Sequence, residues 1–276
     1  YLFLGDSISG SSDIDVTSAD YMFEGGSVGD NLGYAVAFAG DLDGDGLGDI
    51  ALTAYGSDLG GTNSGAIYIF LAADLPATGS TLEAEDAHLV LIGEEGLDYA
   101  GMSVNSAGDI DDDGQDDLLV GAAYNDAVGA SSGAGYVLFG ESLEIGGELD
   151  LSESNIIIYG SDAGDMAGNT IASAGDVDGD GKADVIIGAP KNDWWSDSSS
   201  DSGMAYLLLG STLSGTDATY DLSNFEYTHA FAGFGSDNET GASVAGGDID
   251  GDGLSDVIIG APEFRSGTTF VVLSEY

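Results

Sequence analysis

Short runs of apolar residues recur along the whole chain and alternate with stretches rich in Gly and Asp. Examples are AIYIFLA at 66–72, DLLVGA at 117–122 and DVIIGA at 184–189. Runs of this length, rich in Val, Ile, Leu and Tyr and bounded by turn residues, predict β-strands. No stretch has a sustained 3.6-residue apolar period with capping residues, so we expect almost no helix.

The chain contains four copies of one longer pattern. The copies begin at Gly40, Gly108, Gly175 and Gly247 and read GDLDGDGLGDIAL, GDIDDDGQDDLLV, GDVDGDGKADVII and GDIDGDGLSDVII. Their spacing is about 70 residues, and each unit holds about four predicted strands. Several strands are apolar at every position, which is typical of strands buried on both faces. Four-stranded sheets repeated radially give a β-propeller, whereas a β-sandwich would not explain the repeat. We therefore predict an all-β propeller of four-stranded antiparallel blades.

The repeat also predicts the division of the chain. We expect one propeller region over 1–276, with 1–25 as the end of a preceding blade. The units that follow are 26–93, 94–160, 161–233 and 234–276, the last without its final strand. The opening YLFLGDSI aligns with YVLFGESL at 136–143 and YLLLGSTL at 206–213, which are third strands of their units. On this alignment the chain begins and ends within a blade, and we interpret it as part of a longer propeller.

The charge balance narrows the choice of partners. The chain has 50 acidic residues against three basic ones, a formal net charge of −47, and no Cys. Nucleic acid and anionic membrane surfaces both require clustered Lys and Arg, so we expect neither as a partner. Nor does any apolar run approach the length of a membrane span, so we expect no direct membrane insertion. Cations are the complement that this charge favours.

Each repeat carries an Asp-rich loop of the form D-x-D-x-D-G-x-x-D. Four carboxylates within nine residues repel one another unless a cation lies among them. Oxygen-only ligands and flexible geometry favour Ca²⁺ over Mg²⁺. The predicted ligands are the Asp side chains at positions 1, 3, 5 and 9 and the backbone carbonyl at position 7: Asp41, Asp43, Asp45, Asp49 and Leu47; Asp109, Asp111, Asp113, Asp117 and Gln115; Asp176, Asp178, Asp180, Asp184 and Lys182; Asp248, Asp250, Asp252, Asp256 and Leu254.

Two alternatives for these loops are weaker. An EF-hand needs a Glu at position 12 and flanking helices, but position 12 is Leu52, Val120, Ile187 or Ile259, each inside a predicted strand. Plain Asp-Gly turns need only one or two Asp. We expect about four calcium sites, and we expect the metal to brace the hairpins rather than to contact a partner.

The order Gly-x-[Ser/Ala]-Val, Gly-Asp-x-Asp-Gly-Asp-Gly, strand and Gly-Ala-Pro resembles the FG-GAP repeats of integrin α-subunit propellers and their secreted bacterial and archaeal relatives. The Phe of the motif is replaced by Leu32, Ala100, Ala167 and Thr240, and the Pro is kept only at Pro190 and Pro262. The resemblance implies a seven-bladed ring with calcium hairpins on one face and partner contacts on the other. It places candidate partner loops at 56–64, 124–132, 191–202 and 263–267, with Trp194, Trp195, Lys191 and Arg265 among their residues. It adds to this face the four Gly-to-Gly stretches that precede the Asp-rich loops, at 25–33, 93–101, 160–168 and 233–241.

The sequence thus favours a calcium-binding extracellular adhesion module with a protein or glycan ligand. The alternatives are the non-catalytic propeller of a secreted enzyme and a structural spacer in a surface protein. Enzymatic motifs are weak. Ser7 is the serine of a Gly-Asp-Ser match to the first block of GDSL esterases but lies in a predicted turn. Ser131 lies in a G-x-S-x-G match without the strand-turn-helix that the nucleophile elbow needs. Since four Ca²⁺ would not neutralise the acidic surplus, we further expect a saline source.

Overall fold

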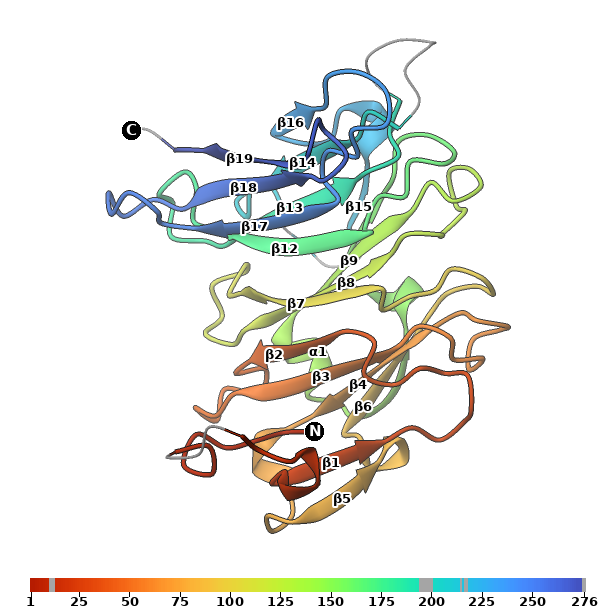
Figure 1. The fold of residues 1–276 in the computed structure, drawn as a ribbon, viewed down its shortest axis with the longest axis vertical. Helices are drawn as coiled ribbons and strands as arrows, with labels where there is room; N and C mark the ends of the chain where they lie inside the picture. The colour runs from red at the N-terminus through yellow and green to blue at the C-terminus, as the bar shows by residue number, and fades with distance from the viewer. Residues whose placement is uncertain (10–12, 194–200, 214, 216–217, 275–276) are drawn as a thin grey trace.

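A computed structural model describes residues 1–276 of the chain except 10–12, 194–200, 214, 216–217 and 275–276. Small β-sheets follow one another from the N-terminal end of the molecule to the C-terminal end (Figure 1). Among the described residues, the only α-helix is the single turn α1 (Gly140–Leu143). The prediction of a nearly helix-free propeller is confirmed.

Each blade is an antiparallel sheet whose strands pair in chain order. The first consists of β2 (Val36–Gly40), β3 (Asp49–Ala54), β4 (Ala66–Phe70) and β6 (Leu89–Ile92). The second consists of β7 (Ser103–Gly108), β8 (Asp117–Ala122), β9 (Ala134–Leu138) and β11 (Ile156–Tyr159). The third consists of β12 (Thr170–Gly175), β13 (Asp184–Ala189), β14 (Met204–Leu208) and β16 (His229–Ala232). The fourth has β17 (Ser243–Gly247), β18 (Asp256–Ala261) and β19 (Thr268–Val272).

A fifth, parallel strand covers the outer edge of a blade, and the sequence patterns did not predict it. It comes from the segment between the third and fourth strands of the following blade. Thus β10 (Gly147–Asp150) pairs with β6, β15 (Ala218–Asp221) pairs with β11, and β5 (Ser80–Glu83) pairs with β1 (Tyr21–Glu24). Each blade therefore holds the next through its backbone as well as through side-chain packing.

Short 3₁₀ turns end these fifth strands: η3 (Ala84–Asp86), η4 (Leu151–Glu153) and η5 (Leu222–Asn224). The carboxylates of Asp150 and Asp221 accept hydrogen bonds from the amides of Ser152 and Ser223. Two further 3₁₀ turns, η1 (Val16–Ser18) and η2 (Ala72–Asp74), complete the helical elements of the described residues. One sequence signal for the fifth strands was available: similar segments recur as TLEAED at 81–86, ELDLSE at 148–153 and TYDLSN at 219–224.

The core lies between successive blades. Every residue of β3, β8 and β13 is buried, in agreement with the apolar residues that make up most of each strand after its initial Asp. Leu91, Val120 and Tyr136 belong to one apolar cluster, and Ile158 and Ile187 belong to the next. Burying large side chains on both faces of a sheet stabilises each by about 1.5 to 3 kcal/mol.

The first strands of neighbouring blades lie side by side and are more polar. The amide of Asn105 donates to the Ile171 carbonyl at 2.8 Å, and the Ser173 hydroxyl donates to the Ala107 carbonyl at 2.8 Å. These bonds replace water at the inner edge of the blades.

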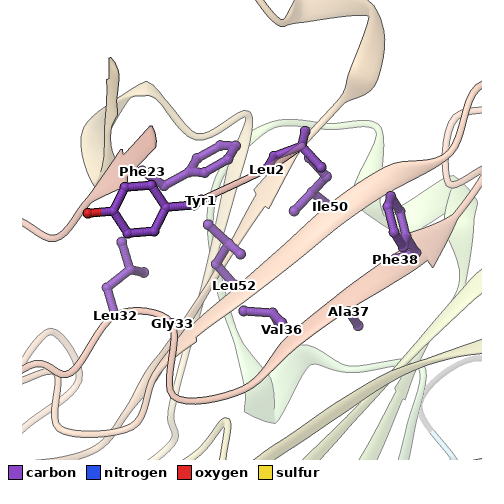
Figure 2. Close-up of a pocket in the computed structure, with 10 residues that line it drawn as sticks. All are labelled: Tyr1, Leu2, Phe23, Leu32, Gly33, Val36, Ala37, Phe38, Ile50 and Leu52. Atoms are coloured by element: carbon purple, nitrogen blue, oxygen red, sulfur yellow. The ribbon is translucent and has the colours of Figure 1, made fainter. Parts of the chain in front are cut away.

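An apolar hollow of about 430 Å³ lies between the N-terminal segment and the face of the first blade formed by β2 and β3. Figure 2 shows its lining, in which Phe23 and Leu2 lie above Ile50 and Leu52. Phe38 is 72% exposed here. Leu2 forms a β-bridge with Tyr21, and the Ser7 hydroxyl in the following turn donates to Asp20 at 2.8 Å.

Backbones of successive blades also meet at glycine. Gly133 (φ +83°) bridges to Ala167, and a Cβ on Gly133 would lie 2.0 Å from the Ala167 carbonyl oxygen. Gly147 has a similar positive φ of +92°, but nothing lies within 4 Å of its Cβ position. Substituting alanine at each glycine therefore measures two free-energy costs: strain of the left-handed backbone alone at Gly147, and that strain plus a clash with the next blade at Gly133.

We expect Gly133→Ala to lower the free energy of unfolding by about 3 kcal/mol or more, because the blades must separate to admit the methyl group. Gly147→Ala should cost about 1 kcal/mol, since only the left-handed backbone conformation is strained. Urea denaturation in saturating CaCl₂ measures both. Equal losses for the two variants would contradict this account of the contact.

Candidate metal centres

The four Asp-rich loops all join the first strand of a blade to its second, at residues 41–48, 109–116, 176–183 and 248–255. They project to the same side of the stack of sheets, on the left in Figure 1. Antiparallel pairing of the two flanking strands positions each loop, with Asp49, Asp117, Asp184 and Asp256 starting the second strands.

In each loop the structure brings three of the four predicted Asp side chains together, with one carboxylate oxygen from each within 4.8 Å of the others. Loops two to four use positions 1, 3 and 9: Asp109, Asp111 and Asp117; Asp176, Asp178 and Asp184; Asp248, Asp250 and Asp256. Loop one instead groups positions 1, 3 and 5, namely Asp41, Asp43 and Asp45. Asp49 in that loop, and Asp113, Asp180 and Asp252 in the others, lie outside these triplets.

Two backbone hydrogen bonds are common to all four loops. The position-1 carboxylate accepts a hydrogen bond from the amide of the position-6 glycine, as Asp109 does from Gly114 at 2.9 Å. The position-5 carboxylate accepts from the position-7 amide, as Asp113 does from Gln115 at 2.8 Å. The chain turns at the position-6 glycine, whose φ is +94° in Gly114. These bonds curl the loop so that its carboxylates converge.

The position-9 carboxylate is the most buried of the four and ties two segments together. Asp117 accepts from the Ile110 amide at 2.7 Å and from the Gly140 amide, just beyond the third strand, at 3.0 Å. Asp184 accepts equivalently from Val177 and Gly210. Both side chains are 0% exposed. The carboxylate thus joins the hairpin to the end of the third strand.

Burial makes these carboxylates costly to ionise without a cation. Loss of water raises the pKa of Asp117 to about 7, against the lowering effect of its two backbone hydrogen bonds, and Asp111 and Asp109 add repulsion. The same loss of water raises the pKa of Asp184 to about 6. In loop one, the Oδ1 atom of Asp41 is buried and has no hydrogen-bond partner among the described residues. An all-oxygen donor set with this surplus of negative charge fits a divalent hard cation.

The opposite end of the sheets carries the predicted partner loops. Lys191 forms an ion pair with Asp201 at 3.2 Å and a second, shorter one with Glu239. Arg265 lies over the Phe264 ring, 5.1 Å from its centroid. Trp194 and Trp195 lie outside the described residues. Lys191 therefore connects two loops of this face.

A row of tyrosines on the same end was not predicted. The rings of Tyr34, Tyr55, Tyr99 and Tyr124 contact one another in sequence, with centroids 4.5, 5.9 and 5.3 Å apart. Tyr34 directly follows one Gly-to-Gly stretch, Tyr99 lies inside the next, and Tyr55 and Tyr124 follow second strands. These tyrosines do not occupy matching places in two units, so the repeat gave no signal for the row.

A buried polar cluster between the blades was also missed. Asp98 accepts a hydrogen bond from the Asn125 amide at 3.1 Å, and the same amide donates to the Tyr136 hydroxyl at 3.2 Å. Asp165, Asn192 and Tyr206 repeat the arrangement one blade later. Asp30, Asp98 and Asp165 share one place in the Gly-to-Gly stretches, where the fourth unit has Asn238.

The enzymatic motifs lie in structural turns. The Ser131 carbonyl accepts from the Met166 amide at 3.1 Å, where successive blades cross. The two histidines lie elsewhere: His88 contacts Asp74 at 3.7 Å and the Glu144 carbonyl at 3.2 Å, and His229 begins β16.

We expect Asp98→Asn to change the pH dependence of stability. Burial raises the pKa of Asp98 to about 6 from an ordinary 3.8. The folded state then binds a proton more tightly than the unfolded state, so stability rises as the pH falls through about 6 towards 4. Asparagine accepts the same hydrogen bonds and does not titrate.

The variant should therefore be more stable than the unmodified chain at pH 7.5 by about 2 kcal/mol, with the difference shrinking towards pH 5. Denaturant unfolding across this range in constant CaCl₂ measures it, with the exposed Glu153→Gln as control. A constant difference across the range would show that Asp98 does not titrate as described.

Comparison with known proteins is consistent with this architecture. FG-GAP repeats match residues 32–70, 100–138, 167–208 and 240–273. Integrin alpha pat-2 of Caenorhabditis elegans is 30% identical over 258 residues, which is 89% of this chain and 19% of that protein. Integrin alpha-PS5 of Drosophila melanogaster is 33% identical over 175 residues, 62% of this chain and 16% of that protein.

A third relative has an enzyme's name. Phosphatidylinositol-glycan-specific phospholipase D of Bos taurus is 35% identical over 165 residues, 58% of this chain and 18% of that protein. The chain thus spans at most 19% of the length of any of these three relatives. With four matched repeats covering more than half of its residues, the chain belongs to the FG-GAP repeat family of integrin α-like β-propellers.

Proposed function

We propose that the chain is a calcium-binding propeller module of the adhesion type, in which Ca²⁺ braces the hairpin of each blade. The observation that carries the proposal is that a triplet of carboxylates, with oxygens within 4.8 Å of one another, recurs in the first hairpin of four sheets, from positions 1, 3 and 9 in three loops and from positions 1, 3 and 5 in loop one. Repulsion within each triplet destabilises the hairpin, and a divalent cation reverses that effect.

The ligand sets proposed are the four Asp side chains of each loop and the position-7 carbonyl. Open loops of this kind suit the millimolar calcium found outside cells. We therefore place the module on the cell surface or in the extracellular space. The described residues include no helix long and apolar enough to cross a membrane.

For the binding partner we propose a protein or a glycan, held at the end of the blades opposite the calcium loops. That end carries the tyrosine row and the ion-paired Lys191. The integrin names of the relatives support an adhesion role. The proposed units are 26–93, 94–160, 161–233 and 234–276 after the end of a preceding blade at 1–25, and the parent ring has seven blades.

The match to a phospholipase D favours a second candidate, in which the chain is the non-catalytic propeller of a secreted enzyme. A glycan and matrix-protein binding panel, run with and without calcium beside a hydrolysis assay on the chain alone, separates the two. Calcium-dependent capture of one ligand class supports adhesion. Hydrolysis that is lost on Ser7→Ala or Ser131→Ala would overturn both candidates.

We expect chelator-treated protein to bind about four Ca²⁺ and to unfold at a higher temperature once they are bound. Each site contributes about 2.7 kcal/mol when free calcium is 100 times its Kd. Isothermal titration calorimetry and thermal melts in EDTA and in CaCl₂ measure both effects. No calcium-dependent heat and no shift in Tm would refute the proposal.

Asp111→Ala should remove one ion from this stoichiometry. Asp112→Gly is its matched control, because it removes an acidic residue from the same loop without removing a proposed ligand. Asp112 has a φ of +68°, and the other three loops have glycine at this position. The control should bind the full number of ions; loss of an ion in both variants would count against the ligand assignment.

The remaining charge leads to a separate expectation. Sixteen of the 50 acidic residues are proposed ligands, and four Ca²⁺ change the net charge only from −47 to −39. We propose a saline environment, where added ions screen this repulsion. At constant CaCl₂, Tm should rise steeply between 0.1 and 2 M NaCl; a flat response would argue for another origin of the acidity.

A further inference from the structure

The four Asp-rich loops are hydrogen-bonded to one another in series. In each of loops two to four, the residue between positions 7 and 9 donates its amide to the carbonyl of the first Asp in the preceding loop. The N···O distances are 2.9 Å from Asp116 to Asp41, 3.4 Å from Ala183 to Asp109 and 2.7 Å from Ser255 to Asp176. Each of these hydrogen bonds, called a joint below, connects the residue before the position-9 Asp of one loop with the position-1 Asp of the preceding loop.

The joint between loops one and two has an additional bond. The Asp116 carboxylate accepts from the Asp41 amide at 2.9 Å, so Asp116 holds both peptide groups that flank Asp41. Gly40 permits this approach, because a Cβ there would lie 2.2 Å from the carboxylate. Positions equivalent to Asp116 are Ala183 and Ser255 in the later loops.

Loop one also differs inside. In the other three loops, Oδ1 of the position-1 Asp accepts the position-4 amide, at 2.6 Å in loop two and 2.7 Å in loops three and four. Oδ1 of Asp41 is instead buried without a partner among the described residues. Asp41 thus has fewer hydrogen bonds within its own loop than its equivalents have, and Asp116 of the neighbouring loop adds one.

We propose that Asp116 is a positioning residue for the first calcium site, and that calcium in loop two strengthens calcium binding in loop one. This inference rests on the proposed calcium function. Asp116 lies between Gln115 and Asp117, so a cation in loop two immobilises it. An immobilised Asp116 holds Asp41 in place before loop one binds its own ion. Loop one then loses less conformational entropy when it binds that ion.

Two electrostatic effects accompany this proposal, one on the coupling and one on the affinity of loop one alone. Bound cations in adjacent loops repel each other, which weakens it. The Asp116 carboxylate is an extra negative charge beside Asp41, which strengthens binding in loop one by itself. Replacing Asp116 by Asn keeps a side-chain acceptor and removes that charge, so it separates orientation from electrostatics.

The experiment follows each loop separately by titrating CaCl₂ into chelator-treated, ¹⁵N-glycine-labelled protein. The amides of Gly46, Gly114, Gly181 and Gly253 each donate to the position-1 Asp of their own loop and report on it. Asp116→Ala should weaken calcium binding at Gly46 about tenfold. The shifts of Gly181 and Gly253 should keep their midpoints and serve as internal controls.

Coupling is tested by disabling loop two with Asp113→Ala, a change at an exposed ligand. That variant should weaken loop one about tenfold, and it should add no further loss when combined with Asp116→Ala. Asp116→Asn should keep most of the coupling. Ser255→Ala is the matched control, since its joint uses the backbone amide, and it should leave all four midpoints unchanged.

The outcomes distinguish failure of the coupling between loops from failure of the proposed calcium binding itself. Absence of any calcium-dependent shift at all four glycines overturns the proposed calcium function. Four normal shifts with the Gly46 midpoint unaffected by both Asp116→Ala and Asp113→Ala overturn only the coupling. If Asp116→Ala does not fold, as judged by Tm in CaCl₂, the Asp113→Ala and Asp116→Asn variants decide the question.

Discussion

The buried carboxylate at the start of each second strand is the interaction on which the rest of a blade depends. Asp117 and Asp184 each accept two backbone amides, one from their own hairpin and one from beyond the third strand. Without this acceptor, two amides would be buried unpaired, at about 1 to 3 kcal/mol each. Ionising the same carboxylate is costly, because water is excluded from it. The carboxylate that pairs these backbone amides therefore favours a cation beside it. The remaining Asp residues of the loop surround the position that such a cation would occupy.

Packing and polarity divide along each blade in a regular way. In the first three blades the second and third strands are buried along their whole length and supply the apolar clusters between blades. The first strands lie at the inner edge and exchange side-chain hydrogen bonds with their neighbours. One end of every sheet is left for the carboxylate loops, and the other for aromatic and charged side chains. The strands can thus be nearly invariant in shape while the loops at the two ends differ.

Much of the fold could be predicted from sequence because it repeats. Apolar runs such as DVIIGA at 184–189 can be buried on both faces only between two sheets, and the four copies of the Asp loop locate four hairpins between first and second strands. The parallel fifth strands escaped because GELD at 147–150 is short and half polar, with no apolar period, and its pairing depends on a residue more than fifty positions away. The Asp98 cluster escaped because Asp, Asn and Tyr come from three segments that only the packed blades bring together. The loops could be located from the sequence, but the hydrogen bond from the Asp41 amide to the Asp116 carboxylate could not, because only the packing of successive blades brings the two residues together.

The fifth strands have a consequence for synthesis of the chain. A ribosome makes β6 at residues 89–92, but its outer edge is covered only when β10 at residues 147–150 has emerged. Each newly made blade therefore has an open edge while the next one is translated, and an open edge can pair with other chains. Dense negative charge on every nascent copy keeps such chains apart during that interval. Overlap between blades thus makes assembly directional, from the N-terminal blade onward, with each blade completed by its successor.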